Sequence, residues 1–251
     1  MIKRILVALI ILSSYSCHFN NDYLVVGHRG AMGHVLENTL ESVEKALELG
    51  VDGIEVDVFK SFTGEIVVHH DPQLNRLSNS DAFIEKITLD SIKKIELKGG
   101  YKIPTLEEVI DLIPKNIFLN IELKGLNTAY STNEIIEEKI RKNNLTSNNF
   151  IISSFRWDEL EKFRSVNKKL PIAILVDSLN KIDNAILLAK KINANSLNPN
   201  KNFLTKSVVK KIKNKNLKVF PYTVNNYLNI KKMKSYEVDG IITDYPERIN
   251  K

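Results

Sequence analysis

Cysteine and tryptophan are nearly absent from this sequence, which has one of each, Cys17 and Trp157, among 251 residues. With a single cysteine the chain forms no internal disulfide, so its stability must come from a packed core. The sequence also has no internal repeat, no low-complexity tract and no GxGxxG glycine pattern. These absences argue against a tandem-repeat architecture and against a dinucleotide-binding fold.

Hydrophobic residues make up 43% of the chain and charged residues 26%, an ordinary globular composition with material for one large core. The formal net charge is +6, and the basic residues are scattered along Lys-rich helices rather than gathered in blocks. Aromatic residues do not alternate with the basic ones as they do in nucleic-acid grooves. We therefore expect a solvated, lysine-rich surface and no nucleic-acid partner, and the sequence indicates no protein partner.

The N-terminus has the pattern of an export signal. Lys3 and Arg4 precede the apolar run Ile5–Leu12, which is too short to span a bilayer. Residues 1–17 are therefore predicted to be a signal peptide. Cys17 lies where the signal would end and resembles a bacterial lipoprotein site, in which Cys17 would become the lipidated first residue. In the alternative, an ordinary signal peptide, Cys17 has no role. We expect an exported protein, periplasmic or membrane-anchored, with a single domain over residues 22–251.

After the signal, strand and helix patterns alternate along the chain. Eight βα units are the number found in a TIM (β/α)8 barrel, so we predict this α/β fold, with a small hairpin and an insertion after the second strand. A doubly wound open sheet is the alternative architecture. The expected elements include a third helix over Asn133–Arg141 and a seventh strand over Lys218–Val224, and Asn38 and Thr39 are predicted to cap the first helix.

The segment Ile54–Val58, Ile-Glu-Val-Asp-Val, alternates apolar and acidic residues with the period of a strand. Residues i and i+2 of a strand share a face, so Glu55 and Asp57 lie side by side. If this face meets water, the pair needs no compensation. If it is buried, the two carboxylates repel each other, and a divalent cation bound by oxygen ligands is the usual compensation.

Two histidines and an arginine follow apolar runs at predicted strand ends. His28 and Arg29 lie in Gly27-His28-Arg29-Gly30 after the first strand, and His70 ends the hairpin arm. Histidine exchanges protons near neutral pH, and arginine holds phosphate oxygens bidentately. In a barrel the active site lies at the carboxyl ends of the strands, where these side chains and the acidic pair would converge. The pattern therefore favours acid–base chemistry on a phosphate.

The motifs resemble those of glycerophosphodiester phosphodiesterases. They are GHRG (27–30), ENT (37–39), IEVDV (54–58), VVHHD (67–71), KIPTLEEV (102–109), NIELK (120–124), ISSF (152–155), YTVN (222–225) and VDGIITDYP (238–246). The resemblance covers almost all of the chain after residue 22. It implies cleavage of glycerophosphodiesters to glycerol 3-phosphate and an alcohol. Two alternatives are phospholipase D-like cleavage of lysophospholipids on the same barrel and a non-catalytic exported protein that binds lipid or phosphate.

The resemblance also implies roles for individual residues. It places one divalent cation, Mg²⁺ or Ca²⁺, on Glu55, Asp57 and Glu122. It makes His28 and His70 the general base and acid, and it suggests that the glycerol hydroxyl next to the phosphoester attacks first, giving a cyclic phosphate that water opens. The candidate substrate-binding residues are Arg29 and Lys124 for phosphate oxygens and Tyr222 for the glycerol carbons.

Overall fold

The computed structural model describes residues 23–143 and 145–249. The predicted signal peptide, with Cys17, lies outside the described residues. Within them, no helix combines the length and the hydropathy that crossing a membrane requires.

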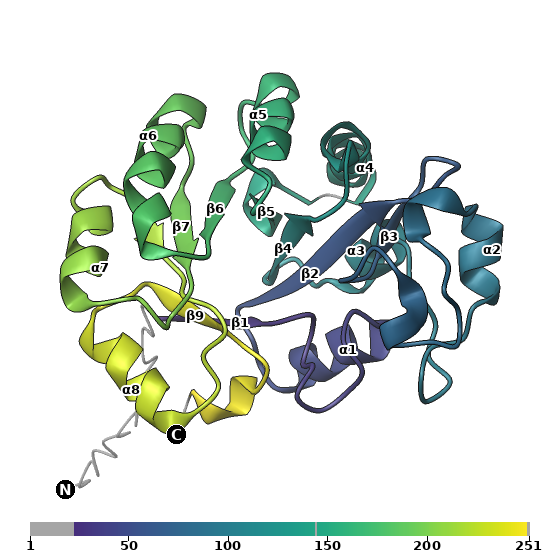
Figure 1. Ribbon diagram of the computed structural model, residues 1–251, viewed down its shortest axis with the longest axis horizontal. Helices are drawn as coiled ribbons and strands as arrows, with labels where there is room; N and C mark the ends of the chain where they lie inside the picture. The colour runs from purple at the N-terminus through teal and green to yellow at the C-terminus, as the bar shows by residue number, and fades with distance from the viewer. Residues whose placement is uncertain (1–22, 144, 250–251) are drawn as a thin grey trace, which may run out of the picture.

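Eight parallel strands form the wall of a barrel, with the helices outside it (Figure 1). Around the wall they follow the order β8-β7-β6-β5-β4-β2-β1-β9. Backbone hydrogen bonds between the β8 and β9 segments bridge the two ends of this path, from Asp239 N to Val219 O and from Ile242 N to Pro221 O, both 3.0 Å. The predicted TIM barrel is confirmed. The strands are β1 (Leu24–Gly27), β2 (Gly53–Lys60), β4 (Phe118–Leu123), β5 (Phe150–Ser154), β6 (Ile172–Val176), β7 (Ser196–Pro199), β8 (Lys218–Val219) and β9 (Gly240–Thr243).

All helices except α2 pack their apolar faces against the strands in one continuous core. Threonine side chains cap several of them, and Thr105 forms with Glu108 the capping box that opens α3. The helices are α1 (Leu40–Glu48), α2 (Leu89–Lys94), α3 (Leu106–Leu112), α4 (Thr128–Asn143), α5 (Trp157–Val166), α6 (Ile182–Ile192), α7 (Lys206–Lys213) and α8 (Tyr227–Ser235).

The predicted hairpin and insertion follow β2. Strand β3 (Ile66–Val68) pairs antiparallel with β2, and the segment after it carries α2. This insertion has a core of its own, which includes Phe59, Leu74, Ile84 and Ile92. The segment is therefore a packed subdomain beside the barrel mouth rather than an open loop.

Two predicted elements differ in extent. Helix α4 begins at Thr128, five residues before the predicted start, because the buried Glu159 carboxylate of the next helix accepts hydrogen bonds from the N–H groups of Asn127 and Ala129, both 3.0 Å. Strand β8 ends at Val219, although Lys218–Val224 was expected. Pro221 has no N–H to donate, so the regular ladder stops before it.

Arg164 contacts two connections at the amino-terminal end of the barrel, the one after α5 and the one after α6. Its guanidinium, largely buried, donates hydrogen bonds to the carbonyl oxygens of Ile192 (2.7 Å), Asn167 (2.9 Å), Leu170 (2.9 Å) and Asn193 (3.3 Å).

Arg164→Met is expected to lower the free energy of unfolding by about 3 kcal/mol, because it leaves buried carbonyl groups without donors. Thermal or urea unfolding followed by circular dichroism measures the change. The neighbouring Lys169→Met is the control, since Lys169 is exposed, and it should change stability by less than about 0.5 kcal/mol. Equal stability of the two variants would contradict the role of Arg164.

Candidate active site

The turn after β1 is shaped by its two glycines. Gly30 has a φ of +84°, and a Cβ there would lie 2.4 Å from Ser42 Oγ. A Cβ on Gly27 would lie 2.5 Å from the carbonyl oxygen of Gly30. Larger residues would therefore push the turn open. The tight turn holds His28 and Arg29 at the rim of the barrel, where the strand ends.

His28 is oriented by a carboxylate from the last strand of the barrel. Its Nδ1 lies 2.6 Å from Asp244 Oδ1, which favours the tautomer with the proton on Nδ1. Asn225 holds the other carboxylate oxygen, with Nδ2 2.6 Å from Oδ2. Both partners keep the pKa of Asp244 below its usual value, although burial opposes them. His28 therefore directs Nε2 towards the pocket, 4.0 Å from Glu55 Oε2.

His70 is oriented in the same way from the opposite side. Its Nδ1 lies 2.7 Å from Asp71 Oδ1, and its Nε2 lies 3.0 Å from Lys124 Nζ. Burial is the main cause of a lowered pKa at His70, so its imidazole is neutral near pH 7 and accepts the lysine proton at Nε2. Each histidine is thus anchored at Nδ1 and leaves Nε2 for proton transfer in the pocket.

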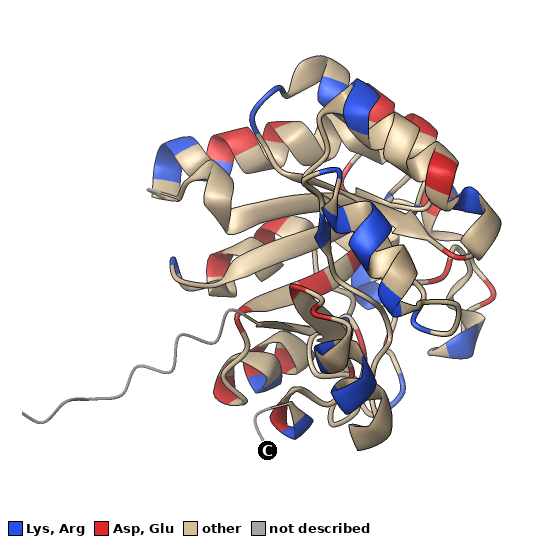
Figure 2. Ribbon diagram, turned by 90° about the vertical axis from the view of Figure 1, so that its left-hand side faces the viewer, with Lys and Arg blue, Asp and Glu red and all other residues tan. Residues whose placement is uncertain are grey.

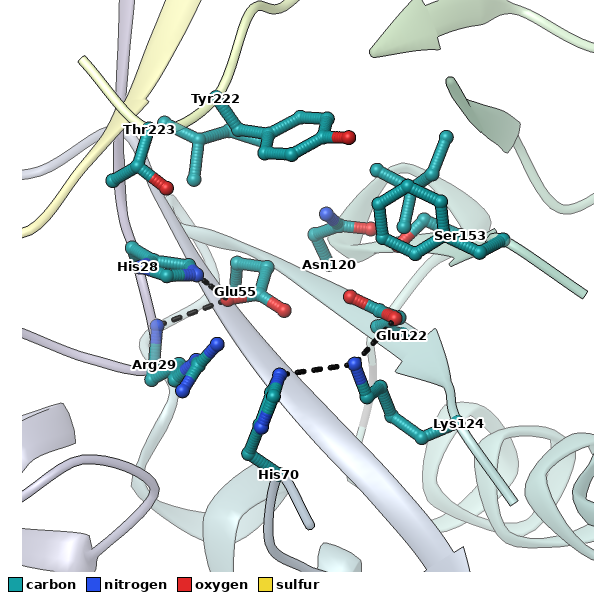
Figure 3. A pocket seen from close by; sticks show the side chains of 13 residues that line it. His28, Arg29, Glu55, His70, Asn120, Glu122, Lys124, Ser153, Tyr222 and Thr223 are labelled. Atoms are coloured by element: carbon teal, nitrogen blue, oxygen red, sulfur yellow. Dashed lines mark hydrogen bonds and ion pairs between the residues drawn. The ribbon is translucent and has the colours of Figure 1, made fainter. Parts of the chain in front are cut away.

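Three carboxylates lie between the two histidines. Glu55 and Asp57 come from β2 and Glu122 from β4, and one oxygen of each lies within 4.8 Å of the others. All three residues are buried. Figure 3 shows Glu55 between His28 and Arg29 on one side and Glu122 and Lys124 on the other. Of the two alternatives for Glu55 and Asp57, a face exposed to water or a buried face, the structure shows the buried one.

The charges of this cluster are only partly compensated by protein side chains. Burial, together with the neighbouring carboxylates, raises the pKa of Glu55 well above its usual value and that of Glu122 to about 8. Burial also acts to raise the pKa of Asp57, but Arg29 and Lys124 outweigh it and lower that pKa. Three hard oxygen donors with a surplus of negative charge fit a divalent cation such as Mg²⁺ or Ca²⁺.

Arg29 and Lys124 neutralise part of this charge. Arg29 Nε lies 3.2 Å from Asp57 Oδ2, and its backbone N–H donates to Glu55 Oε2 at 2.9 Å. Lys124 Nζ lies 3.2 Å from Glu122 Oε1 and 3.8 Å from Asp57 Oδ1. Both side chains also line the pocket, so each can contact a substrate phosphate while it remains anchored to the protein.

A second layer of ion pairs is centred on the buried carboxylate of Glu37. It accepts a hydrogen bond from Arg29 Nη1 at 2.6 Å and two from Arg76, at 2.7 and 2.9 Å. Arg76, from the insertion, also contacts the Asp71 carboxylate through Nε. Although burial opposes it, hydrogen bonding to the two arginines lowers the pKa of Glu37 to about 2. The network links Arg29 to Asp71, the partner of His70.

The Glu37 pair predicts a loss of stability in acid. The pKa is about 2 in the folded protein against 4.5 for the ordinary side chain, so the ionised form stabilises the fold above pH 4.5 and this stabilisation is lost between pH 4.5 and 2. The size is on the order of 3 kcal/mol. Glu37→Gln should lower stability at pH 7 and flatten the pH dependence in that window, measured by urea unfolding. Glu44→Gln, at an exposed glutamate, should keep the wild-type profile; a Glu37→Gln profile that matches it would contradict the prediction.

Aromatic side chains close the remaining side of the pocket. Tyr222 donates a hydrogen bond to the carbonyl oxygen of Val176 at 3.1 Å, and its ring meets Phe155 edge to face at 5.6 Å. Beneath them, the side-chain oxygens of Asn120 and Ser153 are buried and lack hydrogen-bond partners within the described residues. This wall offers an apolar surface and polar groups for a small polyol.

Sequence reasoning selected eight site residues, and the structure brings all of them together. One pocket is lined by His28, Arg29, Glu55, His70, Glu122, Lys124 and Tyr222. Asp57 lies beside this pocket as the third member of the carboxylate cluster. Their individual roles stay predictions.

Four residues around the site were not assigned these positions from the sequence. Asn38, predicted as a cap, instead donates from Nδ2 to Asp57 Oδ2 at 2.9 Å, and Thr39 alone caps α1. Asp244 directly follows the last strand, so its place at a strand end was a signal that could have identified it. Nothing in the local sequence around Glu37 and Arg76 indicates that they pair.

The profile of the glycerophosphoryl diester phosphodiesterase family matches residues 28–248. The chain belongs to this family. A glycerophosphodiester phosphodiesterase from Caldanaerobacter subterraneus is 36% identical, over 90% of this chain and 96% of the relative. The family assignment agrees with the motifs from GHRG to the last strand.

Solved structures of this glycerophosphodiester phosphodiesterase family share the barrel. The enzyme from Thermotoga maritima is 32% identical with a TM-score of 0.75, covering 90% of this chain and 96% of that one. An Oleispira antarctica phosphodiesterase, solved in complex with the product sn-glycerol-3-phosphate, is 27% identical with a TM-score of 0.81, covering 90% and 95%.

Proposed function

We propose that the protein hydrolyses glycerophosphodiesters to glycerol 3-phosphate and an alcohol. The observation that carries this proposal is the pair of histidines, His28 and His70, each held by a carboxylate at Nδ1 and directed by Nε2 into one pocket. Between them lies a carboxylate cluster that fits a divalent cation. The product complex of the Oleispira relative supports glycerol 3-phosphate as the product class.

In the proposed reaction the two histidines move protons at Nε2. His28, as base, accepts the proton of the glycerol hydroxyl next to the phosphoester, which attacks phosphorus and forms a cyclic phosphate. His70 acts as acid in the protonated form of its imidazole, which takes up a proton from solvent at Nε2, and it donates this proton to the alcohol oxygen when the bond of that oxygen to phosphorus breaks. Water then opens the cycle, with proton transfer in the reverse direction.

The other residues of the pocket bind and orient the substrate. Arg29 and Lys124 hold the phosphate oxygens, and the Tyr222 ring packs against the glycerol carbons. Glu55, Asp57 and Glu122 would hold one Mg²⁺ or Ca²⁺. When bound, this cation supplies positive charge that neutralises the charge developing on the phosphate.

A turnover assay tests the proposal. Glycerophosphocholine and glycerophosphoethanolamine should release glycerol 3-phosphate, EDTA should abolish release, and added Mg²⁺ or Ca²⁺ should restore it. An analogue that lacks the hydroxyl next to the phosphoester should bind but not react, which separates the cyclic route from direct attack by water. Faster turnover of lysophosphatidylcholine would favour the phospholipase D-like alternative. If no diester is turned over, the non-catalytic binding protein becomes the favoured function.

We further propose that the chain is exported and that Cys17 anchors it to a membrane. The support is the sequence of residues 1–17. Mass spectrometry of the membrane fraction should find an N-terminal lipidated Cys17. A soluble periplasmic chain with an unmodified Cys17 would contradict the anchor.

A further inference from the structure

Four helix ends, with the connections that follow them at the amino-terminal end of the barrel, form a surface that we call the basic face. They are residues 138–149, 164–171, 190–195 and 210–218, which lead into β5, β6, β7 and β8. These strands are consecutive neighbours in the barrel wall, so the four connections lie side by side in an arc. The active-site pocket opens at the other end of the same strands.

The basic face has a larger net positive charge than the whole protein. Its segments contain thirteen Lys and Arg residues and one acidic residue, Glu138, a net charge of +12. The whole chain carries +6, so all remaining residues together carry −6. Figure 2, viewed from the side of α7, shows part of this lysine run in blue. The lysines that look scattered along the sequence are therefore gathered by the fold.

Helix dipoles account for only part of this concentration, because eight of the thirteen basic residues lie in the last turns of α4 to α7 and the others do not. A basic residue stabilises the last turn of a helix by about 0.3–1 kcal/mol, and the effect ends with that turn. Helix α5 ends at Val166 and α7 at Lys213, but Lys168, Lys169 and Lys215 lie beyond these ends. On the other side of the barrel, the last turn of α3 has no basic residue and that of α1 has only Lys45. The last turn of α8 has Lys232 and Lys234, but Glu237 and Asp239 follow them before the next strand.

Five basic residues of this face pair with carboxylates, but others are exposed and form no ion pair. Lys168, Lys169, Lys215 and Lys218 are all exposed, and none forms an ion pair within the part of the chain that the structure describes. Val166, with 47% of its surface exposed, lies among them. Clustered like charges repel each other and cost stability, which calls for an anionic partner in compensation.

The N-terminal segment attaches at this same end of the molecule. β1 starts at Leu24, whose N–H bonds the carbonyl oxygen of Asp239 in the connection before β9. The apolar run Ile5–Leu12 and Cys17 precede it by a few residues in sequence. We propose that the basic face docks on the anionic surface of a lipid bilayer, with the active-site pocket facing away from it. Each lysine close to such a surface contributes about a fivefold increase in affinity.

A bilayer fits the basic face better than a nucleic acid does. Single-stranded nucleic acids are bound by aromatic platforms interleaved with basic residues. The four segments contain no aromatic residue, and the phenylalanines directly beside them, Phe150 and Phe163, are buried. The broad arc of flexible lysines around an exposed valine matches a flat anionic surface.

Vesicle binding by the full chain tests this proposal. The probes are phosphatidylcholine vesicles, alone and with about one third phosphatidylglycerol, compared by cosedimentation at low and high salt. The variant K168E/K169E/K215E/K218E removes charge from the basic face. The matched control K60E/K86E/K94E/K201E changes the net charge equally at exposed or half-exposed lysines outside that face. All proteins keep the same N-terminus, so binding through its apolar run is common to them.

Wild type and control are expected to prefer the anionic vesicles in a salt-sensitive way, and the basic-face variant to lose at least about 100-fold of that preference. An equal loss in both variants, or none in either, would overturn the proposal. So would tighter binding of wild type to double-stranded DNA at equal phosphate concentration. For the orientation, saturating anionic vesicles should leave turnover of soluble glycerophosphocholine unchanged, and inhibition would show that the catalytic end docks. The binding measurements stand whether or not the proposed hydrolysis is found.

Discussion

His28→Ala and His70→Ala are each expected to lower kcat for glycerophosphocholine by at least about 100-fold. Each substitution removes the Nε2 that transfers a proton in the proposed reaction, while the carboxylate cluster keeps its oxygen ligands. The remaining imidazole cannot replace the missing one, because Asp244 and Asp71 hold the two rings on opposite sides of the pocket. Steady-state kinetics at saturating metal measures the loss.

The control is His34→Ala. His34 is exposed, and its Nε2 lies 3.0 Å from Glu247 Oε2, away from the pocket-lining residues. It should retain kcat within about twofold of wild type, because no proton transfer depends on it. The two catalytic variants should also differ from Asp244→Asn, which keeps the His28 ring but weakens the preference for its tautomer and should lose less rate. Near-native turnover of His28→Ala or His70→Ala would overturn the assignment of that residue.

The sequence predicted the barrel and the location of the site because both follow from short-range patterns. The alternation of Ile54–Val58 placed Glu55 and Asp57 on one strand face, and the apolar runs before His28 and His70 placed them at strand ends. Once eight such strands close into a barrel, their carboxyl ends meet at one mouth. Convergence of the predicted residues therefore required no knowledge of their long-range contacts.

What the sequence did not predict depends on contacts between distant segments. Three examples join residues between 8 and 216 positions apart in the sequence. Glu159 caps α4, Glu37 accepts hydrogen bonds from Arg29 and Arg76, and His28 pairs with Asp244. Their side chains obey no local period, so only the folded barrel brings them together. The basic face has the same origin, since lysines that are scattered along the sequence become neighbours through the order of β5 to β8.

Glu122→Gln is expected to abolish the stabilisation of the protein by Mg²⁺ or Ca²⁺ and to reduce turnover at least about 100-fold. Glu55, Asp57 and Glu122 have oxygens within 4.8 Å of one another and are buried, so losing one removes a third of the proposed protein ligands. In wild type, a cation at about 100 times its Kd contributes about 2.7 kcal/mol to stability. This corresponds to a rise in Tm of roughly 5–10 °C for a domain of this size.

In EDTA, where no cation is bound, Glu122→Gln should not lower the Tm. The pKa of Glu122 is raised to about 8, because burial and Asp57 disfavour its ionised form, so without a cation the side chain is mainly protonated at pH 7. A neutral glutamine resembles that protonated form and relieves the remaining repulsion. Glu122→Gln should therefore match or exceed the Tm of wild type in EDTA, even though it loses the rise on adding metal. A substitution that simply destabilised the fold would lower the Tm both in EDTA and with metal.

Differential scanning fluorimetry with EDTA, Mg²⁺ or Ca²⁺ makes the comparison, with Glu134→Gln as the control. Glu134 lies exposed on α4, outside the pocket, and its variant should keep both the wild-type Tm in EDTA and the rise with metal. Because the readout is stability, it separates cation binding from the chemistry of His28 and His70. A Glu122→Gln protein with the full wild-type rise in Tm would remove Glu122 from the cation site, and the two β2 carboxylates would then need another partner.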